Sequence, residues 1–231
     1  MNSPKIGRVL ALGTIAALVS WTGIRALLAR PPETPKSALP KPAMDEPIAS
    51  KKGQQVVVLA GGCFWGVQAV FEHVKGVKSA VSGYAGGFVN SPSYESVSLG
   101  VTGHAESVEV HYDPSKITFG HLLMVFFSAA HDPTQWNRQG PDTGSQYRSA
   151  IFFTSEEQRR IAESYIAQLN AAKVYSRPIV TKVSPLKAFF PAEEYHQDFL
   201  KSHPDSPYIV ANDLPKLAAL KKEFPELYRN D

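Results

Sequence analysis

Val56 to Glu72 reads VVVLAGGCFWGVQAVFE, and this stretch decides how the folded part of the chain begins. The residues from Gln55 to Ala60 form a β-branched, apolar run, which is typical of a buried strand. From Phe64 to Val74 the apolar residues recur at helical spacing instead, and a pair of glycines supplies the turn. The sequence therefore predicts a strand, a tight turn and a helix, with Cys63 at the junction.

Cys63 is the single cysteine among the 231 residues, which excludes an intramolecular disulfide and a zinc site built from cysteines. A lone cysteine is most often a small buried apolar residue. Here, however, the first turn of the predicted helix offers unpaired N–H groups and the positive end of a dipole, both of which stabilise a thiolate. Gly66 lacks a side chain one turn further on, which we interpret as room for a substrate. We therefore predict a nucleophilic Cys63, with a buried structural thiol as the alternative.

Two large aromatic residues, Phe64 and Trp65, follow the cysteine. One interpretation is packing at the helix end. The other is an apolar wall beside the thiol, which could bind a methyl or thioether group because sulfur and aromatic rings attract each other.

Glu106 is a carboxylate on an otherwise apolar strand face. In the segment AESVEVHYD it is in phase with Val108, Val110 and Tyr112, because side chains alternate along a strand. Burial would raise the pKa of its carboxyl group and suit it to donate a proton. The alternative is a strand-end glutamate that reaches solvent.

Tyr147 and Asp142 are the next candidates. Strand phase places Tyr147 on the same face as Ile151, where a buried hydroxyl needs a hydrogen-bond partner. Asp142 lies just before it in a loop rich in glycine and proline, where aspartate is also a common turn former. The seven histidines show no metal-ligand spacing, so we predict no metal site.

The flanking segments differ from the folded part in composition. Residues 1–30 carry basic residues before an apolar run, which predicts a signal peptide or a membrane anchor and hence an exported or membrane-anchored protein, on the periplasmic side in a bacterium. Residues 31–53 are rich in proline and read as a linker, so the folded domain is predicted over residues 54–231. The net charge of +3 is spread without basic blocks, which argues against a nucleic-acid partner.

The remaining pattern mixes strands and helices without regular βαβ units, which favours an α+β domain of two layers. Further strands are predicted at 77–84, 106–112, 146–153 and 179–183, and further helices at 118–130, 155–172, 192–201 and 214–224.

Several motifs together resemble one known family, the A-type peptide methionine sulfoxide reductases. They occur in the order found in that family and span residues 56–204: GGCFWG, GYAGG, YESV, TGHAESVEVHYDP, DTGSQYRSAIF and AEEYHQDF. The resemblance implies a two-layer α/β plait of the ferredoxin-like type around a mixed sheet. It also implies repair of oxidised proteins and of free methionine sulfoxide, acting on the S epimer without a bound cofactor.

The resemblance assigns roles to individual residues. Cys63 would attack the sulfoxide sulfur and become a sulfenic acid, with Phe64 and Trp65 around the S-methyl group. Glu106, Tyr94 and Tyr147 would hydrogen-bond the sulfoxide oxygen, and Asp142 would help to anchor the substrate.

One feature departs from many relatives, which resolve the sulfenic acid with a second, C-terminal cysteine. Residues 204–231 contain none. We therefore expect an external thiol reductant, which could be thioredoxin, glutaredoxin or glutathione, and by default a monomer. Two other functions stay open: a cysteine hydrolase or acyltransferase with His104 or His196 as base, and a binder of oxidised proteins without turnover.

Overall fold

The computed structural model describes residues 33–36 and 38–230. All of these residues belong to one compact unit. The predicted signal peptide or anchor lies outside the described residues. Within them, no helix combines the length and the apolar character that a membrane span needs.

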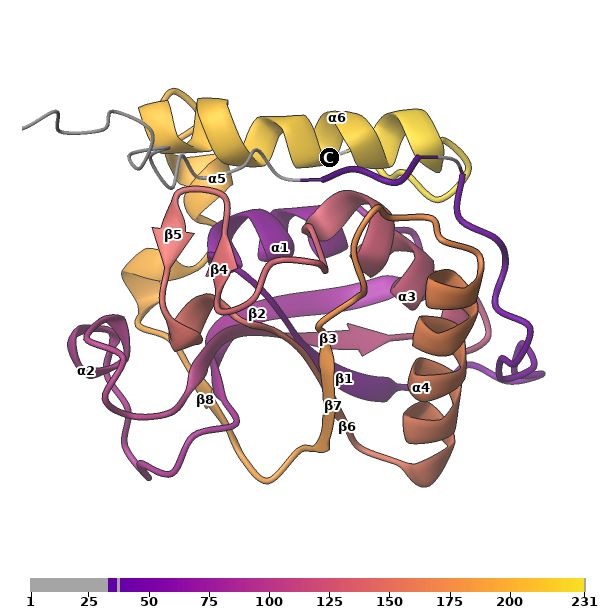
Figure 1. Ribbon diagram of the computed structural model, residues 1–231, viewed down its shortest axis with the longest axis horizontal. Coiled ribbons are helices and arrows are strands. Elements are labelled where there is room, and N and C mark those ends of the chain that lie inside the picture. Colours follow the sequence, from indigo (N-terminus) through magenta and orange to yellow (C-terminus); the bar gives the residue numbers. More distant parts are fainter. Residues whose placement is uncertain (1–32, 37, 231) are drawn as a thin grey trace, which may run out of the picture. The chain divides into compact units, whose positions relative to one another are not determined.

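The centre of the fold is a mixed sheet of six strands in the order β7-β6-β1-β3-β2-β8 (Figure 1). All neighbouring strands are antiparallel except β6 and β7, which are parallel. The strands of this sheet are β1 (Gln55–Gly61), β2 (Val77–Ala85), β3 (Ala105–Tyr112), β6 (Ser149–Phe153), β7 (Lys182–Pro185) and β8 (Phe189–Pro191). A short hairpin, β4 (Arg138–Gln139) with β5 (Asp142–Thr143), stands apart from it.

The helices follow the same chain order. The α-helices are α1 (Phe64–Glu72), α2 (Tyr94–Ser98), α3 (Phe119–Val125), α4 (Glu156–Ala171), α5 (Phe199–Ser202) and α6 (Leu214–Glu223). Shorter turns of 3-10 or π type are η1 (Phe126–Ala130), η2 (Ser145–Tyr147), η3 (Glu194–His196) and η4 (Ile209–Asp213).

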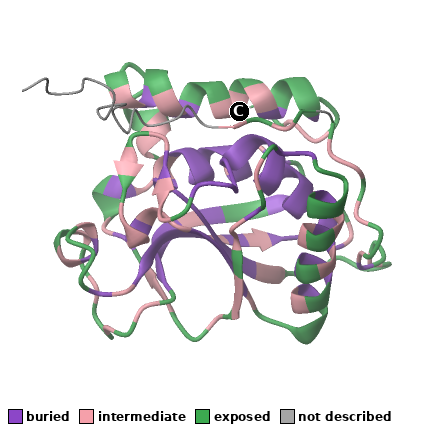
Figure 2. Ribbon diagram, viewed as in Figure 1, coloured by how far each residue is buried: buried purple, intermediate pink, exposed green. Residues whose placement is uncertain are grey.

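The larger apolar core lies between one face of the sheet and the helices α1, α3 and α4. A smaller cluster on the other face contains Phe152, against which Leu186 and Phe189 pack. Helix α1 is buried along most of its length (Figure 2), because the sheet lies on one side of it and α6 on the other. That placement explains why the α1 sequence is apolar around nearly its whole circumference.

Most of the predicted elements are present with small shifts, and the α+β class is confirmed. Ser155 caps helix α4 as predicted, and its hydroxyl accepts the backbone N–H of Gln158. The strand predicted at 146–153 begins only at Ser149, because Tyr147 belongs to the turn η2 and its N–H bonds the Gly144 carbonyl. The helix predicted at 192–201 is two short pieces, η3 and α5.

The segment predicted as a linker contacts the domain in its described part. The first three amides of α3 would lack partners within the helix. Asp45 accepts the Gly120 N–H at 2.8 Å, Glu46 accepts the Phe119 N–H at 2.8 Å, and the Thr118 hydroxyl accepts the third. Two of these three partners therefore come from outside the predicted domain boundary.

We expect Asp45→Ala to lower the free energy of unfolding by about 1–2 kcal/mol, because the Gly120 amide loses its acceptor. Urea denaturation followed by circular dichroism measures this. Lys51→Ala, which changes an exposed residue of the same segment, is the matched control. Equal midpoints for both variants would mean that the segment contributes no cap.

Candidate functional site around Cys63

The turn between β1 and α1 presents Cys63 as the N-cap residue of α1. Gly62 adopts a φ of +94°, and a Cβ there would lie 2.4 Å from the Gln139 side chain, so glycine is required for conformation and for space. Cys63 is buried, with 8% of its surface exposed. Strand and helix together fix this thiol at the first turn of α1, as the sequence predicts.

Burial raises the pKa of the Cys63 thiol well above its usual value, and the negative charges of Glu106 and Asp213 add to the effect. The Trp65 backbone amide and the Lys216 ammonium act in the opposite direction but do not outweigh it. The resting thiol is therefore protonated at neutral pH. The sequence predicts thiolate stabilisation by the helix terminus, which is present here only as the smaller effect.

Glu106 lies on β3 and is 2% exposed, on the core-facing side of the strand as its phase predicts. Its Oε2 accepts the backbone N–H of Phe64, the residue directly after Cys63, at 3.1 Å. Burial, with a contribution from the charge of Asp142, raises the pKa of Glu106 to about 8. At neutral pH this carboxyl group is mostly protonated and can donate a hydrogen bond next to Cys63.

Two half-buried phenols accompany the carboxyl group. Burial raises the pKa of Tyr94 and of Tyr147, and both also respond to the charges of Glu106 and Cys63. They are therefore neutral donors that belong to the same site. The Tyr94 backbone N–H donates to the Glu193 carboxylate at 2.9 Å, and the Tyr84 hydroxyl donates to the other oxygen at 2.8 Å, so Glu193 ties α2 to β2.

Asp142 lies on β5 at the same site. Its carboxylate accepts the hydroxyl of Tyr208, which precedes η4. Burial raises the pKa of Asp142, whereas Tyr208 and the Lys216 ammonium lower it. Tyr147 interacts electrostatically with the other four candidates, Cys63, Glu106, Tyr94 and Asp142, and Glu106 interacts with Cys63 and Asp142, so the structure brings all five to one site.

The two aromatic residues after the cysteine differ in their environment. Phe64 is 1% exposed and packs against Tyr84 and His196 at ring-centroid distances of 5.9 and 5.1 Å. Trp65 is only partly buried and stacks on Phe199 at 3.7 Å, while its Nε1 donates to His196 Nδ1 at 3.2 Å. Trp65 therefore offers the larger accessible aromatic surface of the pair.

Neither histidine proposed as an alternative base has a hydrogen bond to Cys63 in the described residues. His104 accepts the Gly87 N–H and bonds the Val89 carbonyl, which fixes the loop that follows β2. His196 accepts from Trp65 and is buried. The described part of the chain also contains no group of three or more His, Cys, Asp or Glu side chains that could hold a metal ion.

Gly66 has a different role from the predicted one. A Cβ at this position would lie 2.1 Å from Asp213 Oδ1 and 2.7 Å from Lys216 Nζ. The space above Gly66 is therefore filled by the C-terminal segment rather than left for a substrate. Sequence reasoning missed Glu193, Tyr208, Asp213 and Lys216, since they lie at least 120 residues beyond Cys63 and no short-range pattern connects them to it.

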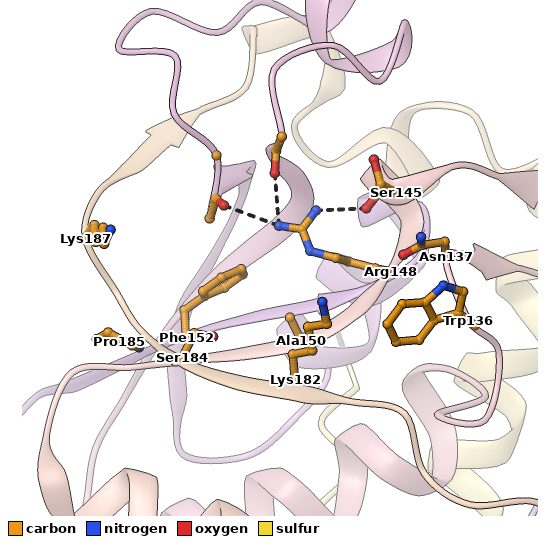
Figure 3. Close-up of a pocket in the computed structure, with 13 residues that line it drawn as sticks. Trp136, Asn137, Ser145, Arg148, Ala150, Phe152, Lys182, Ser184, Pro185 and Lys187 are labelled. Carbon is orange, nitrogen blue, oxygen red and sulfur yellow. Dashed lines mark hydrogen bonds between the residues drawn. The ribbon is translucent and has the colours of Figure 1, made fainter.

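A separate cavity of about 530 Å³ is lined by basic and aromatic residues, including Arg148, Lys182 and Trp136 (Figure 3). The Arg148 guanidinium donates to the backbone carbonyls of Ser145 and Gly103, at 2.8 and 3.1 Å, which braces the loops on either side. None of the predicted site residues lines this cavity.

Comparison with known proteins gives consistent results. The family model described as peptide methionine sulfoxide reductase matches residues 55–228. A protein of Mesorhizobium japonicum named peptide methionine sulfoxide reductase MsrA 2 is 60% identical over 185 residues, covering 80% of this chain and 94% of the relative. A protein of the same name from Synechocystis is 47% identical over 190 residues, covering 81% and 89%.

Two solved structures are similar in fold. Reduced Mxr1 from Saccharomyces cerevisiae has a TM-score of 0.60 at 34% identity and covers 71% of this chain and 92% of its own. Methionine sulfoxide reductase A of Corynebacterium diphtheriae has a TM-score of 0.59 at 35% identity, with coverages of 75% and 87%.

Proposed function

Because the chain belongs to the peptide methionine sulfoxide reductase family, we propose that Cys63 is the residue that takes the oxygen from methionine sulfoxide, with Glu106 as its proton donor. The chain is a methionine sulfoxide reductase of the A type and an oxidoreductase of protein repair. The observation that carries the residue assignment is the buried Glu106 carboxyl group, which accepts the backbone N–H of Phe64 directly after Cys63 and whose pKa burial raises to about 8.

The geometry supports the following sequence of steps. Glu106 donates its proton to the sulfoxide oxygen, and the neutral hydroxyls of Tyr94 and Tyr147 donate hydrogen bonds to it, which makes the sulfur electrophilic. The Cys63 thiol gives its proton to the Glu106 carboxylate as its sulfur attacks. The attack forms a bond between the Cys63 sulfur and the methionine sulfur. The oxygen then passes from the methionine sulfur to the Cys63 sulfur, so that this S–S bond and the S–O bond of the substrate both break, methionine leaves, and Cys63 carries the oxygen as a sulfenic acid. The thiol and the sulfoxide thus become a sulfenic acid and a thioether, with Glu106 protonated again.

Trp65 is proposed as the surface for the substrate S-methyl group, with Phe64 behind it. The stacking of Trp65 on Phe199 and its hydrogen bond to His196 fix the indole, so the apolar wall is rigid before a substrate arrives. Asp142 is proposed as an anchor for the substrate main chain or its water molecules, in a site oriented by Tyr208.

Single turnover of the full-length chain with each epimer of a methionine sulfoxide peptide tests the assignment. Without reductant, we expect about one equivalent of methionine from the S epimer only, together with a trapped sulfenic acid on Cys63. Cys63→Ser should form none. Methionine from neither epimer would contradict the reductase; thioester hydrolysis that depends on Cys63 would then point to a hydrolase, and sulfoxide binding without product to a binder.

The reductant is proposed to be an external thiol, because no second cysteine is available to resolve the sulfenic acid. Thioredoxin, glutaredoxin and glutathione remain the candidates. After the single turnover, each is added separately and methionine formation is followed. Turnover with dithiothreitol that fails with every monothiol and redoxin would argue against this proposal.

Four further proposals concern the fold of the domain, the export or anchoring of the chain, its range of substrates and its oligomeric state. The ferredoxin-like plait is supported by the strand order β6-β1-β3-β2 and by helices α1 and α3, which form the connections from β1 to β2 and from β3 to β6.

Export or membrane anchoring is supported by the composition of residues 1–30 and is tested by cell fractionation. Action on free methionine sulfoxide as well as on proteins is tested with both substrates, and a monomeric state by light scattering.

A further inference from the structure

A buried ion pair joins the C-terminal segment of the chain to the helix that carries the nucleophile. Asp213 ends η4 and Lys216 lies in the first turn of α6, with Nζ and Oδ1 3.0 Å apart. The Asp213 side chain is fully buried and that of Lys216 is 15% exposed. Burying two charges costs free energy that their attraction alone often fails to return, so such a pair is a weak device for stability.

The position of the pair is specific. Both charged groups lie over Gly66, in the same first turn of α1 that starts at Cys63, and a Cβ at Gly66 would overlap both. Asp213 Oδ1 is paired with Lys216, whereas Oδ2 is buried without a hydrogen-bond partner among the described residues. The aspartate is thus held at this turn with only the ammonium to balance its charge.

The surroundings of Cys63 contain more acidic groups than basic ones. The titratable groups that interact with it are the carboxyl groups of Glu106 on β3 and Asp213 on η4, the phenols of Tyr94, Tyr147 and Tyr208, and the ammonium of Lys216 on α6. Glu106 and Asp213 oppose negative charge on the sulfur, and Lys216 favours it. Asp142 on β5 acts on Glu106 and on the three phenols. The reaction nevertheless requires negative charge to develop on sulfur as the thiol loses its proton.

We propose that Lys216 is a positioning residue for the sulfoxide reduction: Asp213 holds its ammonium against the first turn of α1, where it stabilises the negative charge that develops on the Cys63 sulfur. The effect of Lys216 on the reaction rests on the proposed function. Its effect on the charge of the Cys63 sulfur does not depend on any substrate. The C-terminal segment contributes a fixed cation to the site in place of a second thiol.

Alkylation of Cys63 by iodoacetamide, followed by mass spectrometry across a pH series, tests the electrostatic content. Only the thiolate reacts, so a change of one unit in the thiol pKa changes the rate about tenfold below the midpoint. We expect Lys216→Met to be alkylated about tenfold more slowly than the parent protein and Asp213→Asn to be alkylated faster. The double variant, in which neither member of the ion pair is charged, should return close to the parent rate.

The alkylation rate is expected to change in opposite directions in Lys216→Met and Asp213→Asn. This distinguishes an electrostatic role from a structural one, because a loosened fold would expose the thiol and speed alkylation in every variant. Lys222→Met, on the exposed side of the same helix, should leave the rate unchanged. A folded Lys216→Met protein that reacts as fast as the parent, or faster, would overturn the proposal. If Lys216→Met does not fold, Asp213→Asn decides: no acceleration overturns the proposal as well.

Single turnover with the S epimer then tests whether Lys216 contributes to sulfoxide reduction. We expect Lys216→Met to lower the rate of methionine formation while the sulfoxide concentration for half-saturation stays the same. Absence of turnover in the parent protein, with the alkylation pattern intact, would disprove the proposed function and leave the electrostatic role of the ion pair standing.

Discussion

We expect Glu106→Gln to lower the single-turnover rate of methionine formation by about 10²–10⁴-fold, because the side chain keeps its shape but has no acidic proton to give to the sulfoxide oxygen. The amide oxygen can still accept the Phe64 N–H, so the first turn of α1 retains that partner. The change is therefore confined to the proton. Rapid-quench measurement with the S epimer under saturating peptide gives the rate directly.

The pH dependence of the same rate supplies a second readout. The pKa of Glu106 is raised to about 8, so the acid form predominates below that value and is lost above it. The parent rate should therefore fall as the pH rises through about 8, and this decline should be absent from the residual rate of Glu106→Gln.

Glu109→Gln is the matched control, since Glu109 lies on the same strand with its side chain partly exposed and paired with His111. It should retain the parent rate and its pH dependence. An unchanged rate in Glu106→Gln, or a decline with pH that persists in it, would show that another group protonates the oxygen.

We expect Gly66→Ala to destabilise the protein by about 3–5 kcal/mol, because the new methyl group would displace Asp213 and leave a buried charge without its partner. An alanine in place of glycine within a helix normally stabilises it by up to about 1 kcal/mol. The close approach of Asp213 Oδ1, 2.1 Å from the ideal Cβ, reverses that sign. Chemical denaturation of the full-length chain measures the change.

A double-mutant cycle isolates the cause. Asp213→Ala removes the obstructing carboxylate, so Gly66→Ala should cost much less in that background than in the parent. Gly53→Ala is the control, because its Cβ would meet Pro114 at an ordinary distance of 3.4 Å. Equal costs of Gly66→Ala in both backgrounds would refute the contact as the origin of the effect.

The sequence predicts the structure best where the contacts that determine it are local in the chain. Strand β3 and its alternation reveal Glu106 as a buried carboxylate, because a period of two is set by the backbone alone. The junction at Cys63 is predicted equally well, since the strand, the turn and the helix each have a characteristic composition. The family motifs then identify the reaction from the order of short segments.

Other features depend on partners far along the chain. Strand β8 pairs with β2 across more than 100 residues, so its three residues have no pattern of their own. Helix α2, capped by Ser93, is too short to show a helical pattern in the sequence. The capping of α3 by Asp45 could not be predicted either, because Asp45 lies in the segment predicted as a linker. Gly66 is misread for the same reason, because the group that fills its space is Asp213, 147 residues later in the sequence.

The protonated resting state of Cys63 has a consequence for the conditions under which such an enzyme works. Peroxides oxidise thiolates, and the oxidant that creates methionine sulfoxide would also consume a repair enzyme that displayed one. Here burial raises the pKa of the Cys63 thiol and keeps it neutral. In the proposed mechanism the thiol gives up its proton only after a bound sulfoxide has taken the proton of Glu106. On that mechanism the substrate itself activates the thiol, and we expect the resting enzyme to resist peroxide until methionine sulfoxide is present.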